Sequence, residues 1–370
     1  MNLRLPGPTP LPPEVCAALA RPMINHRGPE FAALLAQITA RLQEVFQTQN
    51  DVLLLTTSGT GGLESAIVNE FSPGDHVLMA VNGVFGERFA AIAVAYGLAV
   101  TRLDFPPGQA ADPAVIAAAL QANLAAKALL VTHNETSTGV TSDLAAIAAV
   151  VQAVRAQGRD DLLLIVDAVS SLGAIDLPTD RWGCDVVVTC AQKAWMTPPG
   201  LAMVSVSPRA WRAQAAARLP RFYFDFARAK SAAEKGATPW TPAISLFYGL
   251  QAALDLMAAE GLPAIFARHR RVGQHTRAAI KALGLSLFAD EAHASDTVTA
   301  VRVPAGIAVK DLLRRLREEH GVIMAGGQGA IAEQIFRIGH LGYVTEADID
   351  QAIAALHAVL GEAGFGGGAR

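Results

Sequence analysis

Short apolar runs alternate with helical patterns between residues 29 and 193, and this alternation restricts the chain to few folds. The clearest runs are 52–57, 128–132, 162–166 and 184–190. Each run leads into a polar or glycine-rich turn, and after the first two runs a segment with apolar residues at helical spacing follows. This pattern predicts an α/β fold, with a mostly parallel sheet covered by helices.

The alternation changes near residues 238–242, where a smaller α+β domain is predicted to begin. We expect an N-terminal arm at residues 1–20, a large domain at 21–250 and a small C-terminal domain at 251–370. The elements expected in the last part are helices at 243–260, 269–283, 309–320 and 346–360, and strands at 286–288, 298–303, near 322 and at 334–338.

Composition narrows the possible functions. Hydrophobic residues make up 52% of the chain and charged residues 17%, which is enough for a sizeable core and an oligomer interface. The net charge of −3 gives no basis for nucleic-acid binding. There is no signal-peptide core, no apolar run of membrane-spanning length and no CxxC pair among the three cysteines. We therefore expect a cytoplasmic protein with no nucleic-acid or membrane partner.

Chemically useful groups follow three of the apolar runs. The first run leads into Ser58-Gly-Thr-Gly-Gly62, the third into Asp167 and the fourth into Gln192 and Lys193. The carboxyl ends of parallel strands meet at one edge of a sheet, where α/β proteins bind ligands. An amine, a carboxylate and an anion cradle are what pyridoxal phosphate needs: a lysine for the Schiff base, an acid beside the ring nitrogen and a phosphate site.

Lys193 is the most informative of these residues. A lysine directly after a buried strand is hard to place on a surface, and burial lowers the pKa of an amine from about 10.4. A neutral amine can attack a carbonyl and later carry a proton, so we predict that Lys193 and Asp167 are catalytic. For Asp167 alone, a cap on the following helix is the simpler interpretation.

Other candidates have ordinary structural interpretations that stay open. The glycine-rich turn with Thr60 can bind a phosphate at a helix N-terminus, or it can be a simple turn with a Ser or Thr cap. Phe85 can stack on a planar ring or pack in the core. Arg337 can clamp a substrate carboxylate or form a surface salt bridge.

Cysteine and metal chemistry are weaker alternatives. Cys184 and Cys190 alternate with apolar residues, as small core residues do. His269 and His275 lie along a basic helix without acidic partners at ligand positions, so we predict no metal site.

Taken together, these segments resemble the class V aminotransferases, and within them the serine–pyruvate, alanine–glyoxylate and serine–glyoxylate group. The likeness covers nearly the whole chain and is most specific in the lysine and arginine segments. The segments that carry it are Pro6-Gly-Pro-Thr9, Ser58-Gly-Thr-Gly-Gly62, Asn82-Gly-Val-Phe-Gly86, His133-Asn-Glu-Thr-Ser-Thr-Gly139, Val166-Asp-Ala-Val-Ser-Ser-Leu-Gly173, Gln192-Lys193, Pro198-Pro-Gly200, Thr238-Pro-Trp-Thr241 and Arg337-Ile-Gly-His-Leu-Gly342.

The resemblance implies fold type I of the pyridoxal-phosphate-dependent transferases, with a seven-stranded type of sheet, and a role for each matching residue. Lys193 would form the Schiff base, Asp167 would face the ring nitrogen, and Arg337 would clamp the substrate carboxylate. The Gly7-Pro8 turn of the arm would line the substrate pocket. Further cofactor contacts are implied for Thr60, Gly61, Phe85, Thr136 and Gln192, and across a homodimer interface for Thr238 and Thr241. The active sites would then lie at the subunit interface.

Two positions depart from the family pattern. Gly62 stands where some relatives have a histidine, which removes one possible phosphate donor. Thr238 replaces an aromatic residue that some eukaryotic relatives have. Neither change affects Lys193 or Asp167.

The resemblance predicts an aminotransferase that moves an amino group from serine or alanine to glyoxylate or pyruvate. Arg27 or His26 could supply a second anion site, so aspartate or 2-aminoethylphosphonate stays open as donor. A lyase such as a cysteine desulfurase, a non-catalytic binding protein on the same fold and a Rossmann dehydrogenase are further alternatives. The lyase needs a mobile cysteine, and the dehydrogenase needs a G-x-G-x-x-G turn that the chain lacks.

Overall fold

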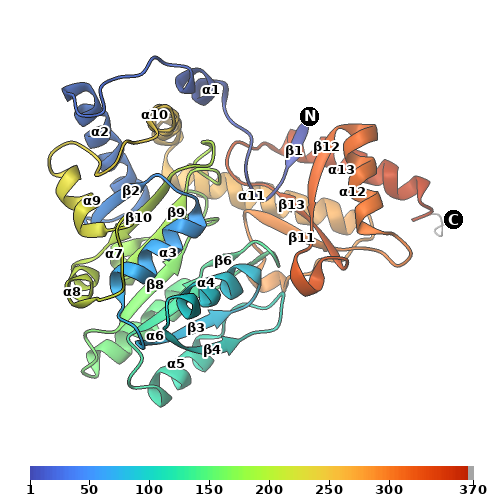
Figure 1. The fold of residues 1–370 in the computed structure, drawn as a ribbon. Helices are drawn as coiled ribbons and strands as arrows, with labels where there is room; N and C mark the ends of the chain where they lie inside the picture. The colour runs from blue at the N-terminus through green and yellow to red at the C-terminus, as the bar shows by residue number, and fades with distance from the viewer. Residues whose placement is uncertain (366–370) are drawn as a thin grey trace.

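Seven strands form the central sheet of the computed structural model, which describes residues 1–365 (Figure 1). Their order is β2-β10-β9-β8-β5-β3-β4, and all neighbours are parallel except the pairs that include β10. The predicted α/β sheet is confirmed, although β10 was not predicted. The strands are β2 (Asp51–Leu55), β3 (His76–Val81), β4 (Ala99–Asp104), β5 (Ala128–Thr132), β8 (Leu163–Asp167), β9 (Val186–Cys190) and β10 (Ala202–Val206).

Helices cover both faces of this sheet, and each face has its own apolar core. Every residue of β5, β8, β9 and β10 is buried, because strands covered on both sides contact apolar side chains above and below. One face is covered by α2 (Pro29–Phe46), α5 (Pro113–Ala122), α6 (Leu144–Ala156) and α10 (Ile244–Glu260), and the other by α3 (Gly59–Glu70), α4 (Val84–Ala95), α8 (Pro208–Ala216) and α9 (Phe226–Ala233).

Shorter elements complete the large part of the molecule. A two-stranded hairpin projects beyond β5 and brings three consecutive polar residues, 135–137, to the same edge as Asp167. The remaining short elements are α1 (Pro13–Leu19), the hairpin strands β6 (Asn134–Glu135) and β7 (Val140–Thr141), and α7 (Thr179–Trp182).

A four-stranded sheet of order β1-β12-β13-β11 forms the smaller part, at the right of Figure 1. Its first strand comes from the N-terminal arm: β1 runs parallel to β12 and pairs Asn2 with Val322. The elements here are β1 (Asn2–Arg4), α11 (Leu262–Ala282), η1 (Glu291–His293), β11 (Val298–Arg302), α12 (Val309–His320), β12 (Val322–Gly326), η2 (Gly329–Ile331), β13 (Ile335–Gly339) and α13 (Glu346–Glu362).

The predicted strand at 286–288 is wrong. Those residues make one isolated bridge, between Leu287 and Val301, instead of a ladder. Ser286 and Phe288 each make one backbone hydrogen bond to β11, and Asp290 caps η1 three residues after Leu287, so there is no length for a strand.

Among residues 1–365, no single helix is long and apolar enough to cross a membrane. Only when α10 and α11 are taken together are they long and apolar enough for a membrane span, and these two helices meet at an 88° bend.

Candidate active site

The carboxyl edge of the central sheet gathers the predicted catalytic residues. Asp167 is the last residue of β8 and pairs with Thr132, the last residue of β5. Lys193 follows the end of β9 by three residues, in the turn before β10. The first turn of α3 lies after β2, so all three features lie where parallel strands end.

Asp167 is a buried carboxylate. Its side chain is 4% exposed, and Oδ1 accepts a hydrogen bond of 3.0 Å from the backbone N–H of Val169. Residues 169–172 form turns and the next helix, α7, begins at Thr179, so Asp167 caps a turn and not a helix. Burial, together with the nearby charge of Glu135, raises the pKa of Asp167 to about 7, while the hydrogen bond from Val169 and the charge of Lys193 oppose the rise. A cation placed against this carboxylate would be strongly favoured.

Lys193 points its amine at the N-terminal arm. Nζ donates a hydrogen bond of 2.6 Å to the backbone oxygen of Pro6. Burial lowers the pKa of Lys193, and the charge of Arg337 lowers it further, while Asp167 opposes the fall. A lowered pKa makes the neutral, nucleophilic amine more available.

The arm approaches this amine closely. A Cβ at Gly7 would lie 2.6 Å from Lys193 Nζ, and Gly7 has a φ of +132°, so only glycine is accommodated there. Pro8 follows and is exposed. The structure therefore places the predicted Gly7-Pro8 turn beside Lys193.

The glycine-rich turn begins α3. Ser58 is the N-cap, and its hydroxyl accepts a hydrogen bond of 3.3 Å from the N–H of Gly61. The turn is therefore capped by a serine, as the simpler interpretation predicted. Thr60 lies in the first turn of a 12-residue helix, so phosphate binding at this helix N-terminus stays possible. Arg88 Nη1 donates to Thr60 Oγ1 at 3.4 Å, which places a cation beside the cradle.

Phe85 lies in the first turn of α4 and is half-buried. The guanidinium of Arg88 lies 4.9 Å from the centre of its ring. The backbone N–H of Phe85 donates to Glu135 Oε2 at 3.0 Å. Phe85 is therefore held by its backbone at the site edge and is not a residue of the apolar core.

Arg337 lies on β13 and is 5% exposed. Nε donates to the carbonyl of Gly326 at 2.8 Å, and Nη1 donates to the carbonyl of Thr136 at 2.9 Å. Among residues 1–365 it has no ion-pair partner and Nη2 has no protein acceptor, so the surface salt bridge is excluded. Burial lowers the pKa of Arg337 to about 10, so it remains a cation at neutral pH.

Two predicted phosphate ligands are not brought to this edge within one chain. Thr238 Oγ1 donates to the carbonyl of Trp240 at 2.7 Å, and Thr241 is exposed. No hydrogen bond recorded for residues 1–365 joins either threonine to Thr60, Asp167 or Lys193. This is the arrangement expected of residues that act on a neighbouring subunit, and it leaves their role a prediction.

Two residues of the site were missed from the sequence. Glu135 lies inside the segment 133–139 and Arg88 follows the Phe85-Gly86 pair, but neither was given a role. A carboxylate three residues after the buried strand β5 was a usable, although weaker, signal for Glu135 than the one for Asp167, which is the last residue of its strand. Arg88 gave no such signal, because charged residues on a helix usually face solvent.

The described residues give little support to cysteine or metal chemistry. Cys184 and Cys190 are buried, and burial raises the pKa of Cys190 to about 12, so it is a protonated thiol. Among residues 1–365, no group of three or more His, Cys, Asp or Glu side chains could hold a metal ion.

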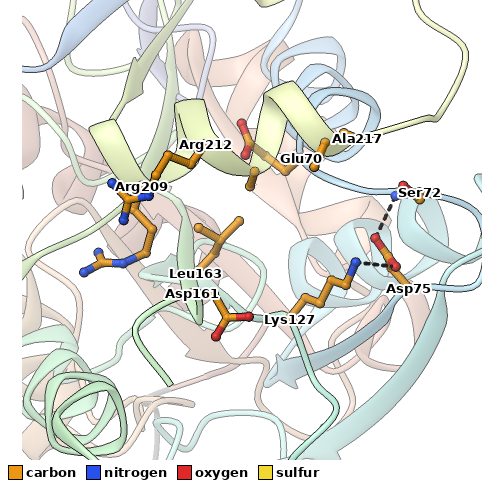
Figure 2. Close-up of a pocket in the computed structure, with 11 residues that line it drawn as sticks. Glu70, Ser72, Asp75, Lys127, Asp161, Leu163, Arg209, Arg212 and Ala217 are labelled. Carbon is orange, nitrogen blue, oxygen red and sulfur yellow. Dashed lines mark hydrogen bonds and ion pairs between the residues drawn. The ribbon is translucent and has the colours of Figure 1, made fainter. Parts of the chain in front are cut away.

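Figure 2 shows a separate pocket of about 250 Å³ at the opposite edge of the sheet, where β5 and β8 begin. Glu70, Lys127 and Arg209 are among its lining residues, and none of the predicted site residues is. Lys127 pairs with Asp75 at 2.7 Å. Glu70 is 3% exposed, and neither of its carboxylate oxygens has a partner in the described structure.

Comparison with known proteins identifies the family. A family profile described as class-V aminotransferase matches residues 6–352. The chain belongs to the class V aminotransferase family. The resemblance predicted from the sequence is confirmed, together with fold type I, and this aminotransferase depends on pyridoxal phosphate.

Two relatives and one solved structure show the extent of the similarity. The aminotransferase is 47% identical to a protein of Synechococcus sp. named soluble hydrogenase, small subunit, over 98% of this chain and 94% of that protein. It is 40% identical to the L-aspartate–glyoxylate aminotransferase of Paracoccus denitrificans, over 98% and 91%. The crystal structure of alanine–glyoxylate aminotransferase from Nostoc sp. matches with a TM-score of 0.92 at 32% identity, over 97% and 95%.

The residues present fit the cofactor. Gln192 Oε1 is buried without a hydrogen-bond partner among the described residues, which is costly unless a ligand group fills the space. Asp167 would hold the ring nitrogen, and the first turn of α3 with Thr60 and Gly61 would hold the phosphate. Thr136 is buried in the hairpin loop, and its carbonyl accepts the hydrogen bond from Arg337 Nη1.

Proposed function

We propose that this aminotransferase transfers the amino group of a small L-amino acid, serine or alanine, to glyoxylate or pyruvate. The observation that carries the proposal is one cluster at the sheet edge, in which Asp167 and Arg337 are both close enough to Lys193 to shift its pKa. These residues supply an acid, an amine and a carboxylate-binding cation within one site.

Each residue has one task in this proposal. When bound, pyridoxal phosphate draws electrons away from the Cα of the amino acid. The Asp167 carboxylate would hold a proton on the ring nitrogen. The Lys193 amine would anchor the cofactor, take the proton from the substrate Cα and deliver it to the cofactor carbon that receives the amino group. The free Nη2 of Arg337 binds the substrate carboxylate. The Gly7-Pro8 turn limits the space beside Lys193 and so favours small side chains.

Aspartate is the second candidate donor, because the Paracoccus denitrificans relative is named for it. Arg27, expected as a second anion site, is exposed and lines a surface pocket together with Thr238. In a homodimer this pocket would lie beside the neighbouring active site. A cysteine desulfurase activity is disfavoured because Cys190 is a buried, protonated thiol.

A homodimer and a cytoplasmic location belong to the same proposal. The exposed Thr241 supports the dimer, and the free state of Cys16, Cys184 and Cys190 supports a reducing compartment.

The test combines a donor panel with one variant. Purified protein supplied with pyridoxal phosphate should absorb visible light and form glycine from glyoxylate with L-serine or L-alanine. Lys193→Ala should remove the covalent cofactor absorbance and lower the rate by about 10²–10⁴-fold, because the proton carrier is lost. Lys127→Ala is the matched control, since this lysine is half-exposed and lies at the other edge of the sheet. Turnover by the Lys193→Ala variant at the wild-type rate would end the proposal, and faster turnover of L-aspartate than of L-serine or L-alanine would select the second donor.

A further inference from the structure

Glu135 is a fully buried carboxylate at the active-site edge that has no task in the reaction proposed above. It lies at the end of β6, directly before Thr136. Its side chain accepts four hydrogen bonds, which is the full capacity expected of a carboxylate. A buried carboxylate with every acceptor site used is held in one position.

One oxygen of Glu135 fixes the start of α4. Oε2 accepts from the N–H of Phe85 and from the N–H of Gly86, each at 3.0 Å. These N–H groups have no partner within the helix, so a carboxylate at this end satisfies them and complements the helix dipole. Phe85 is therefore positioned by a residue on a different element.

The other oxygen fixes the hairpin loop. Oε1 accepts from the N–H of Ser137 at 3.0 Å and from its hydroxyl at 2.5 Å. Ser137 Oγ in turn accepts from the N–H of Val84 at 3.0 Å. A Cβ at Gly83 would lie 2.4 Å from Glu135 Cγ, so the glycine before α4 is what permits this approach.

The same three-residue segment also holds the arginine. Thr136, between Glu135 and Ser137, accepts a hydrogen bond of 2.9 Å from Arg337 Nη1 through its carbonyl. A displacement of the loop would therefore move the acceptor of Arg337 and the N-terminus of α4 together.

Charge adds a second link to the arginine. Burial lowers the pKa of Arg337, and among residues 1–365 the charge of Glu135 opposes this fall. Burial raises the pKa of Glu135, and its hydrogen bonds from Ser137, Gly86 and Phe85 oppose that rise. Glu135 thus favours the charged form of Arg337, and its own charged form is favoured by the four hydrogen bonds that it accepts.

We propose that Glu135 is a positioning residue that sets the ring-stacking face of Phe85 and the carboxylate-binding end of Arg337 together, so that cofactor binding and amino-donor binding depend on one side chain. This inference rests on the proposed function of the site. It predicts that one substitution will weaken both binding steps, although Glu135 touches neither ligand.

The experiment uses Glu135→Gln in the full-length protein. Whichever way the amide turns, its NH2 group faces two donors, so either α4 or the loop loses its acceptor. The dissociation constant for pyridoxal phosphate and the KM for the amino donor should each rise by on the order of tenfold. The visible circular dichroism of the bound cofactor should also change, because the ring is no longer held at the same angle.

Two single variants separate the linked effects. Phe85→Ala should raise mainly the cofactor dissociation constant, and Arg337→Gln mainly the donor KM. Glu135→Gln should raise both, and combining it with Phe85→Ala should give a cofactor effect smaller than the sum of the two. A change in only one of the two constants, or full additivity, would overturn the inference.

Glu70→Gln is the matched control, because it makes the same change in a buried carboxylate at the opposite edge of the sheet. If Glu135→Gln and Glu70→Gln weaken cofactor binding and donor binding equally, the effect is one of general packing and the inference is overturned. If Glu135→Gln does not fold, Ser137→Ala must raise both the cofactor dissociation constant and the donor KM, by smaller factors. If it raises neither, the inference is overturned. Failure of the function itself would appear separately, as wild-type turnover by Lys193→Ala.

Discussion

At the scale of single residues, the site works against the preference of charged groups for water. Asp167 and Lys193 are packed where neither is well solvated. Burial raises the pKa of Asp167 and lowers the pKa of Lys193, so it favours the neutral form of each. Binding of a cationic ring nitrogen would restore the charge of Asp167. The free energy of unfolding of the cofactor-free protein should therefore include the cost of burying the ionised Asp167 side chain.

The pH dependence of unfolding tests this point. The pKa of Asp167 is raised from 3.8 to about 7 in the folded protein, so between these values the folded chain holds a proton that the unfolded chain has lost. The free energy of unfolding should fall as pH rises through this window. Asp167→Asn removes the titrating group, so the cofactor-free variant should exceed the wild type at pH 8 by up to a few kcal/mol, with little difference at pH 4.

Urea unfolding at both pH values measures the effect. The exposed Asp161 provides the control, because Asp161→Asn makes the same change on the protein surface, outside the active site. If the free energy of unfolding of Asp167→Asn changes with pH as it does in the wild type, this carboxylate is not the group responsible. The same variant should lose transamination activity, which is the usual relation between stability and function at active sites.

At the scale of elements, α3 lies unusually close to the sheet. A Cβ at Gly62 would lie 2.7 Å from Val188 Cγ1 and 3.1 Å from the Cβ of Ala202. Glycine at this position therefore lets the phosphate-cradle helix approach β9 and β10. A histidine at this position would need different residues on those strands, and Arg88 already places a cation beside the cradle.

Gly62→Ala should destabilise the protein by about 1–3 kcal/mol, because the added methyl group forces α3 away from the sheet. Denaturant unfolding measures the loss. Gly361→Ala is the control: nothing lies within 4 Å of its Cβ, and alanine in a helix should be neutral or stabilising by about 0.5–1 kcal/mol. Equal effects of the two substitutions would argue against the packing explanation.

The same scale shows why some elements could be predicted from the sequence and others could not. β8 and β9 are apolar runs that lead to Asp167 and Lys193. The strands, the sheet edge where they end and the candidate catalytic residues could therefore all be recognised from the local sequence. β1 was not predicted, because its three residues gain their structure from β12. Glu135 was overlooked for the same reason, since its partners Phe85 and Gly86 lie 50 and 49 positions away.

At the scale of the whole molecule, the exposed face around the α9–α10 loop favours the proposed homodimer. Phe222 is 65% exposed and Tyr223 44% exposed, and both stack on Trp240, with ring centres 4.9 and 6.0 Å away. Exposed aromatic clusters usually mark an interface. Thr238 and Thr241 flank the same tryptophan, so a partner covering this face would meet both threonines.

Sedimentation should therefore give a mass of twice 38.7 kDa. Phe222→Asp should shift the protein toward the monomer and weaken cofactor retention, because the neighbouring threonines would no longer reach the phosphate. Leu124→Asp changes another exposed apolar residue, 72% exposed at the end of α5, and should leave the mass unchanged. A wild-type protein that sediments as a monomer with bound cofactor would contradict the dimer.

The pairing of β1 with β12 has a consequence for synthesis of the protein. Asn2 is made long before its partner Val322. The strand pairing of the arm must therefore wait for β12, although Thr9 can already bond to the backbone of Gln192 and Lys193. A nascent chain that stalls before residue 322 would thus hold the arm over its reactive lysine by fewer contacts, which gives the cell a chemical difference between finished and unfinished copies.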